Sequence, residues 1–153
     1  MSQVLWSELE KEVRAIIAGP LMARAKLQAV CRLLRDRVSY YDWVGFYLVD
    51  GDGRELVLGP FEGQPTEHVR ISFGSGICGQ AAETEQIFVV QDVAGESNYL
   101  SCSPHVRSEI VLPIFREGRV VGELDIDSHT LAPFTPQDEA FLERVCELVA
   151  PLL

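Results

Sequence analysis

Two apolar stretches decide the fold class of this chain: EIVLPIF at residues 109–115 and RVVGELDID at residues 119–127. Both are rich in β-branched and other apolar residues, and only a short charged segment around Glu117-Gly118 separates them. Two such runs joined by a short segment that contains glycine are typical of a β-hairpin. The sequence therefore predicts two adjacent antiparallel strands here.

The register of this hairpin decides which side chains meet. A two-residue loop would set Glu109 opposite Ile126. A three-residue loop that ends in a left-handed Gly118 sets Glu109 opposite Asp125, and it also aligns the apolar residues of both strands on one face. Because register follows the apolar pattern, we expect the second arrangement.

The rest of the chain reads as helices at both ends with strands between them. The apolar spacing predicts helices over 7–19, 21–38, 78–86 and 134–153, the last with Thr135 as N-cap and Pro136 in its first turn. Alternation predicts further strands over 42–50, 54–61, 67–73 and 87–93, whereas residues 94–108 read as a loop. This order predicts one α+β domain over residues 1–153, an antiparallel β-sheet flanked by N- and C-terminal helices.

Composition and charge exclude several classes of function. The chain has 153 residues and a formal net charge of −10. That balance disfavours nucleic acid and anionic membranes as partners, since phosphate binding needs a basic surface. We expect no signal peptide, because acidic residues interrupt the apolar positions of residues 1–17, and no apolar run approaches the roughly 18 residues of a membrane span. We therefore expect a cytoplasmic protein whose thiols are mostly reduced.

Three glycines in RISFGSGICGQ, residues 70–80, have the G-x-G-x-x-G spacing of a dinucleotide-binding turn: Gly74, Gly76 and Gly79. That turn requires a βαβ unit and an acidic residue about 20 positions further on. Asp92 comes too early, and the chain favours antiparallel strand pairs. We therefore expect no nucleotide cofactor and interpret the glycines as a tight strand-to-helix turn.

The four cysteines occupy two kinds of position, two in the expected core and two at a helix start or in a loop. Cys31 and Cys146 lie on apolar helix stripes and are expected in the core. Cys78 opens a short helix, whose N-terminus should expose the thiol and lower its pKa, and Cys102 lies in a polar loop. Residue spacing alone leaves open whether these two thiols react or are incidental. No paired Cys/His spacing is present, so no structural zinc or other metal site is expected.

Carboxylates supply the second candidate feature. On a strand, Glu123, Asp125 and Asp127 share one face, and the expected register brings Glu109 beside them. Such a cluster needs a cation or a shared proton, because like charges repel. The alternative is a solvated acidic face.

Two aromatic residues of the strand over 42–50, Trp43 and Tyr47, point to the same side by strand parity. They could form the wall of a pocket, or they could be ordinary core residues.

Taken together, these motifs resemble those of the free methionine-(R)-sulfoxide reductases, which are GAF domains. The motifs occur in order from Trp43 to the C-terminal helix: WVGFYL, LVLGPFEG, GSGICG, SEIVLPIF and GELDIDS. The resemblance implies a GAF-type antiparallel sheet flanked by helices and a homodimer. It also implies reduction of the R-sulfoxide of free methionine and recycling by thioredoxin.

Matched residue by residue, the resemblance implies roles for seven side chains. Cys102 corresponds to the catalytic cysteine and Cys78 to a second family cysteine, which would resolve the oxidised nucleophile. The remaining matches are a substrate-holding set of Glu109, Asp125 and Asp127 and an aromatic wall of Trp43 and Tyr47. The chain departs from the family pattern at His68, where many members carry a third cysteine, and in the loop YLSCSPHV around Cys102.

The chemistry is consistent with these residue types. A thiolate attacks sulfoxide sulfur while an acid protonates the departing oxygen, and a second thiol resolves the sulfenic acid to a disulfide. Two alternatives remain: a GAF module that binds a small ligand without catalysis, and a thiol redox sensor without a dedicated substrate.

Overall fold

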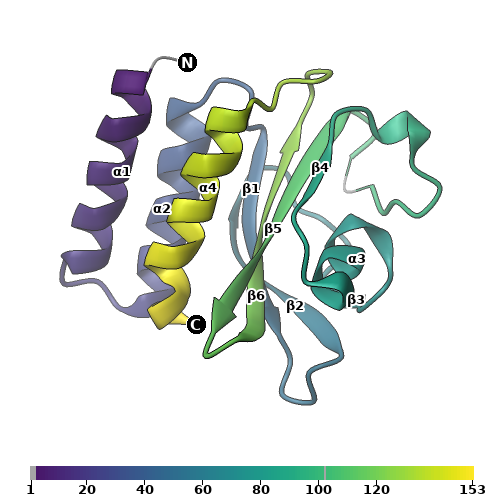
Figure 1. Cartoon of the computed structure of the whole chain (residues 1–153), viewed down its shortest axis with the longest axis horizontal. Helices are drawn as coiled ribbons and strands as arrows, with labels where there is room; N and C mark the ends of the chain where they lie inside the picture. Colours follow the sequence, from purple (N-terminus) through teal and green to yellow (C-terminus); the bar gives the residue numbers. More distant parts are fainter. Residues whose placement is uncertain (1–2, 102) are drawn as a thin grey trace.

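A computed structural model describes residues 3–101 and 103–153 of the chain. Six strands form one antiparallel sheet in the order β3-β2-β1-β6-β5-β4 (Figure 1). In these residues no helix has the length and apolarity needed to cross a bilayer. The elements are α1 (Gln3–Ala18), α2 (Ala23–Arg37), β1 (Trp43–Val49), β2 (Glu55–Glu62), β3 (Arg70–Ser72), α3 (Gly76–Thr84), β4 (Phe88–Val90), β5 (Ser108–Arg116), β6 (Arg119–Ser128) and α4 (Pro136–Val149), with short 3-10 turns at Val93–Gly95 and Ala150–Leu152.

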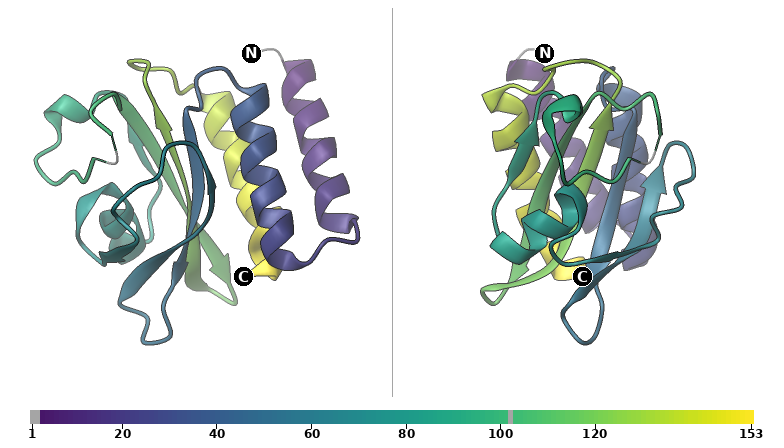
Figure 2. Two further views of the ribbon diagram at one scale, coloured as in Figure 1. Left: turned by 180° about the vertical axis from the view of Figure 1, so that it is seen from behind. Right: turned by 90° about the vertical axis from the view of Figure 1, so that its right-hand side faces the viewer.

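Three helices cover one face of the sheet. Helices α2 and α4 pack against the strands, and α1 lies on the outside against both of them (Figures 1 and 2). Alternate residues of the central strands, such as Phe46, Leu112 and Leu124, are buried under these helices. This layer is the main hydrophobic core, and it fixes the sheet from one side.

The start of α4 shows why the predicted C-terminal helix forms where it does. The Thr135 side chain accepts a hydrogen bond from the Asp138 backbone N–H, and the Asp138 carboxylate accepts one from the Thr135 N–H. The hydroxyls of Tyr40 and Tyr41 also donate to Asp138, at 2.8 and 2.6 Å. The predicted N-cap is confirmed, and the capping box ties the helix to the turn before β1.

The opposite face of the sheet is covered by α3 and the segment that follows β4 (Figure 2). A second, smaller apolar cluster lies here and includes Trp43, Tyr47, Ile77, Cys78 and Val111. Because successive residues of a strand point to opposite faces, β1 contributes Val44 and Phe46 to one layer and Trp43 and Tyr47 to the other.

Several predicted boundaries were wrong. Helix α1 begins at Gln3 because Trp6 is buried and packs on Phe141 of α4, at a ring distance of 4.8 Å, which extends the helix beyond the start at residue 7. The edge strands β3 and β4 are shorter than their predicted ranges, since each pairs with only one neighbour.

The predicted hairpin register was also wrong. Glu117 and Gly118 both have positive φ, 51° and 76°, and form a two-residue turn between the paired Arg116 and Arg119. A bulge then adds one residue to β6 near Val121, so Glu109 pairs with Asp127 instead of Asp125. The turn and the bulge together shift the pairing by two residues from the predicted register. Because strand residues alternate between faces, each side chain stays on the face of the sheet that was predicted for it.

Candidate active site

Three side chains from three elements meet on the α3 side of the sheet. The Cys78 thiol from α3 and the carboxylates of Glu109 on β5 and Asp125 on β6 each place one atom within 4.8 Å of the others. Cys78 Sγ lies 4.0 Å from Glu109 Oε2. Only 4–5% of each residue's surface is exposed. The predicted carboxylate cluster is confirmed, and the alternative of a solvated acidic face is wrong.

Two further carboxylates of β6 lie on the same face. Asp127 is buried and pairs with Glu109 across the strands. Glu123 is fully buried, and a hydrogen bond with the Cys78 side chain only partly offsets the effect of burial on its pKa. Strand alternation placed Glu123 on this face from the sequence, but its complete burial had no signal in the sequence.

Burial raises the pKa of the carboxyl groups in this cluster. For Glu109 the largest cause is loss of solvent, followed by the charges of Asp125 and Asp127. Burial likewise raises the pKa of Asp125 and, with the Asp125 charge, that of Glu123. Burial and mutual repulsion therefore disfavour the ionised form of these carboxyls, which suits one of them to act as an acid, and a bound cation would offset the repulsion among those that ionise.

Cys78 differs from its predicted state. The sequence suggested an exposed thiol with a lowered pKa at a helix N-terminus, but the side chain is buried. Burial raises its pKa well above the ordinary value, and the charges of Asp125, Glu123 and Glu109 raise it further. The first turn of α3 faces the sheet and the acids on it, so their effect outweighs that of the helix dipole.

The glycine motif builds the turn that brings Cys78 to the sheet. Gly74 and Gly76 have φ values of 91° and 65°, a region that favours glycine. A Cβ on Gly79 would lie 2.5 Å from the Ser72 carbonyl oxygen, and Gly74 N–H donates to Gly79 O at 2.8 Å. These contacts support the prediction of a tight strand-to-helix turn.

The two predicted aromatic residues lie near each other, with ring centroids 6.4 Å apart. Tyr47 lines the cavity beside the acids, and its hydroxyl donates to His68 O at 2.8 Å. Trp43 stacks on Phe61 at 5.5 Å and donates from Nε1 to Gln64 O. Trp43 is therefore buried behind Tyr47 and is not part of the cavity lining.

The cavity at the cluster is small. Its volume is about 20 Å³, room for about one water molecule. Its lining consists of Tyr47, His68, Ile71, Ser75, Gly76, Ile77, Cys78, Leu100, Glu109 and Asp125.

Comparison of the sequence with known proteins identifies the family to which the chain belongs. Residues 22–153 match the family model described as GAF domain. The chain is 37% identical over 140 residues to the free methionine-R-sulfoxide reductase of Escherichia coli K12, covering 92% of this chain and 83% of that protein. The chain belongs to the free methionine-R-sulfoxide reductase family of GAF domains.

Solved structures agree with this assignment. The free methionine-R-sulfoxide reductase from Neisseria meningitidis, in complex with its substrate, superimposes with a TM-score of 0.91 at 36% identity and covers 99% of this chain and 91% of that chain. The Staphylococcus aureus enzyme, also in complex with substrate, gives 0.87 at 34% identity and covers 97% and 95%. The predicted GAF-type α+β fold and the predicted family are both confirmed.

In this member of the family, one loop closes the cavity from outside. Asn98 donates from its side chain to Gly74 O and accepts from Gly76 N–H, both at 2.8 Å. Gln80 donates to Asn98 O, and His68 Nε2 lies 2.9 Å from Ser101 O. These contacts hold residues 98–101 over the N-terminus of α3.

The predicted nucleophile, Cys102, lies outside the described residues. Its neighbour Ser101 contacts His68, which lines the cavity. Leu100 lines the same cavity, and a Cβ on Gly76 would lie 2.8 Å from its Cγ. The residues that lead to Cys102 are therefore next to the acid cluster.

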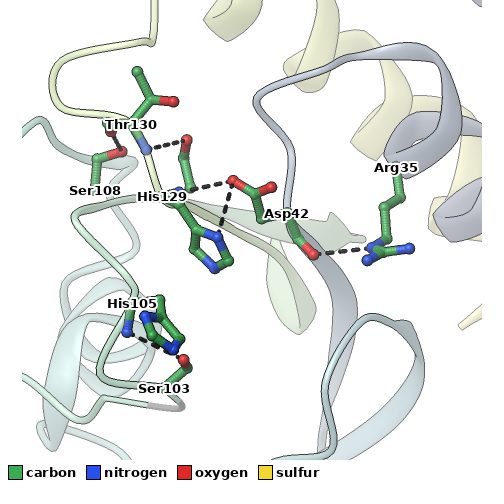
Figure 3. A network of polar contacts seen from close by, with 8 residues as sticks. Arg35, Asp42, Ser103, His105, Ser108, His129 and Thr130 are labelled. Atoms are coloured by element: carbon green, nitrogen blue, oxygen red, sulfur yellow. Dashed lines mark hydrogen bonds and ion pairs between the residues drawn. The ribbon is translucent and has the colours of Figure 1, made fainter.

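A separate group of polar contacts holds the chain before β5 and after β6 (Figure 3). Ser103 Oγ accepts from the His105 N–H at 3.2 Å. The Asp42 carboxylate accepts from the His129 N–H at 2.7 Å, and Arg35 Nε donates to the Asp42 carbonyl oxygen at 2.9 Å. The contacts of Asp42 tie the start of β1 and the residue after β6 to α2.

The remaining cysteines are core residues, as predicted. Cys31 and Cys146 are buried in the cluster under the helices. Burial is the main cause of the raised pKa of each thiol. Neither residue lines the cavity at the acid cluster.

Proposed function

We propose that this protein reduces the R-sulfoxide of free methionine to methionine, with Cys102 as nucleophile and Cys78 as the resolving thiol. The observation that carries the proposal is the buried cluster of Cys78, Glu109 and Asp125 at a cavity beside Tyr47. Relatives at 36–37% identity in Escherichia coli and Saccharomyces cerevisiae are named free methionine-R-sulfoxide reductases, which supports the same substrate here.

The cluster suits a free amino acid. A substrate ammonium beside Glu109, Asp125 and Asp127 offsets the repulsion among buried carboxylates. Tyr47 provides an apolar surface for the side chain of the substrate, and Trp43 supports that surface from behind. A methionine within a peptide has no free ammonium, so this arrangement favours the free amino acid.

In the first step the Cys102 thiolate attacks the sulfoxide sulfur. A protonated carboxyl, for which Glu109 is best suited because burial raises its pKa, gives its proton to the departing oxygen. The oxygen passes to the Cys102 sulfur as the bond between the two sulfurs breaks, so methionine leaves with its sulfur reduced by two electrons and Cys102 becomes a sulfenic acid.

In the second step Cys78 loses its proton to a neighbouring carboxylate and attacks the Cys102 sulfur. A disulfide forms and the sulfenic oxygen leaves as water. Burial and the nearby acids keep the Cys78 thiol protonated in the resting protein, which limits its side reactions. A dithiol reductant then restores both thiols. By family resemblance we take this reductant to be a thioredoxin-like protein and the active form to be a homodimer.

A second candidate is a GAF module that binds a small ligand without turnover or acts as a redox sensor. The burial of Cys78 and the raised pKa of its thiol favour this candidate, because a protonated, buried thiol is a poor nucleophile. The binding module predicts that methionine sulfoxide is bound without release of methionine, whereas the redox sensor predicts oxidation by peroxide without stereoselective reduction of a sulfoxide.

A single-turnover experiment separates the two candidates. Reduced protein, mixed with methionine-R-sulfoxide without reductant, should release one equivalent of methionine and form a Cys78–Cys102 disulfide that peptide mass mapping detects. Cys78→Ser should release the same equivalent and stop as a sulfenic acid, trapped by dimedone. Normal turnover of Cys78→Ser with thioredoxin would remove Cys78 from the cycle, and absence of methionine release would favour the binding module.

A further inference from the structure

The cluster of Cys78, Glu109 and Asp125 also has the composition of a metal site. One sulfur and two carboxylate oxygens, from α3, β5 and β6, lie within 4.8 Å of one another, and the Cys78–Glu109 separation is 4.0 Å. Tetrahedral zinc with bonds of about 2.0–2.3 Å separates neighbouring ligand atoms by roughly 3.5 Å. Small side-chain rotations therefore bring the three atoms to bonding distance of one ion.

Two independent observations point to a small cation at this place. The cavity of about 20 Å³ is lined by all three side chains, and no lysine or arginine contributes to its lining among residues 3–101 and 103–153. In the same described part of the chain, Asp125 Oδ1 is buried without a hydrogen-bond partner. Buried polar atoms normally have partners, so this atom indicates a site for a positive ligand.

We propose that Cys78, Glu109 and Asp125 bind one Zn²⁺ ion, with water in the fourth position. A thiolate with carboxylates suits Zn²⁺, whereas Mg²⁺ and Ca²⁺ take oxygen ligands alone. The proposal departs from the sequence-based prediction of no zinc or other metal site, which rested on the absence of paired Cys/His spacing. This site is assembled from residues that are distant in the sequence, so no spacing motif reveals it.

The consequence for activity rests on the proposed function. Zinc at this position takes the place of the substrate ammonium and holds the resolving sulfur as a bound thiolate. Zinc is therefore a reversible inhibitor of turnover that competes with methionine sulfoxide. Chelation restores the free cluster.

Cobalt provides a direct test, because a Co²⁺–thiolate bond gives a charge-transfer band in the near ultraviolet and tetrahedral Co²⁺ gives strong visible bands. The titration uses reduced, chelator-treated Cys102→Ser protein, so that only one of the two candidate thiols is present. We expect both sets of bands to saturate at one equivalent of Co²⁺, and one equivalent of Zn²⁺ to remove them. Millimolar Mg²⁺ should leave them unchanged.

Matched variants in the same background identify the ligands. Cys78→Ser should abolish the charge-transfer band, and Asp125→Asn should weaken binding by at least about tenfold, since even an outer partner of a metal ligand is worth that much. Cys31→Ala is the control and should bind Co²⁺ as the parent does. Circular dichroism verifies that each variant is folded.

A missing thiolate band in the parent, or a band that persists in Cys78→Ser, would overturn the site. The readout requires no turnover, so the site and the proposed function can fail separately. Co²⁺ binding without any sulfoxide reduction would refute the function and leave the site standing. Sulfoxide reduction without a thiolate band would refute the metal site and leave the proposed function unaffected.

Discussion

Replacing Glu123 by glutamine should change how the stability of the protein depends on pH. Glu123 is fully buried, and burial raises its folded-state pKa well above the usual value, with the Asp125 charge as a second cause. In the unfolded chain the carboxyl ionises near pH 4.3, as an ordinary glutamate does. Its favourable contribution to stability is therefore complete below that pH and is lost as the pH rises towards the folded-state pKa.

The magnitude follows from linkage. A proton that the folded state retains and the unfolded state loses lowers the free energy of unfolding by about 1.4 kcal/mol per pH unit. Glu123→Gln removes this slope for one carboxyl, so its stability relative to wild type should increase as the pH rises from 5 towards the folded-state pKa of Glu123. Cys78, Glu109, Asp125 and Asp127 face the same space and are present in both proteins.

The assay is urea unfolding at pH 5, 6 and 7 with a chelator present. The relative gain is measured as a rise in the urea midpoint of Glu123→Gln relative to that of wild type as the pH increases. Glu8→Gln, at an exposed position on α1, is the matched control and should follow wild type at every pH. If the difference between Glu123→Gln and wild type is the same at pH 5 and pH 7, then Glu123 ionises in the folded state and the argument fails.

Three further substitutions test other parts of the account. Asp125→Asn should raise KM for methionine sulfoxide roughly 10–100-fold, and more than Glu123→Gln does, because Asp125 lines the cavity; equal kinetics would count against the cluster. Cys31→Ala should lower the free energy of unfolding by about 1–3 kcal/mol in the same urea assay and leave kcat/KM unchanged, as a core truncation does; lost activity in a folded variant would mean that its role is misassigned. Gly79→Ala should lower both stability and activity, since its Cβ would lie 2.5 Å from the Ser72 carbonyl oxygen; wild-type values in both assays would contradict the proposed role of the turn.

Periodicity predicted most of the fold. Alternation along β6 placed Glu123, Asp125 and Asp127 on one face, and the structure keeps them there. The pairing of Glu109 with Asp127 was not predictable, because a two-residue turn and a bulge look the same in sequence as a three-residue loop. The error did not move the cluster, since a shift of two residues leaves every side chain on its own face.

Burial was harder to predict than position. A cysteine at a helix N-terminus usually has an activated thiol, yet Cys78 lies against the sheet and its acids. The sequence could not show which face of such a short helix meets the strands. It also gave no sign that Trp43 would lie behind Tyr47, because strand parity assigns a side of the sheet but not a depth.

The most direct test of the central claim is a stereochemical one. Pure reduced protein is incubated with racemic free methionine sulfoxide and a dithiol, and the sulfoxide that remains is separated by chiral chromatography. We predict that the R-sulfoxide disappears while the S-sulfoxide persists, and that the Cys102→Ser variant leaves both intact. Consumption of both epimers, of neither, or of the R-sulfoxide by Cys102→Ser would contradict the proposed reaction or its nucleophile.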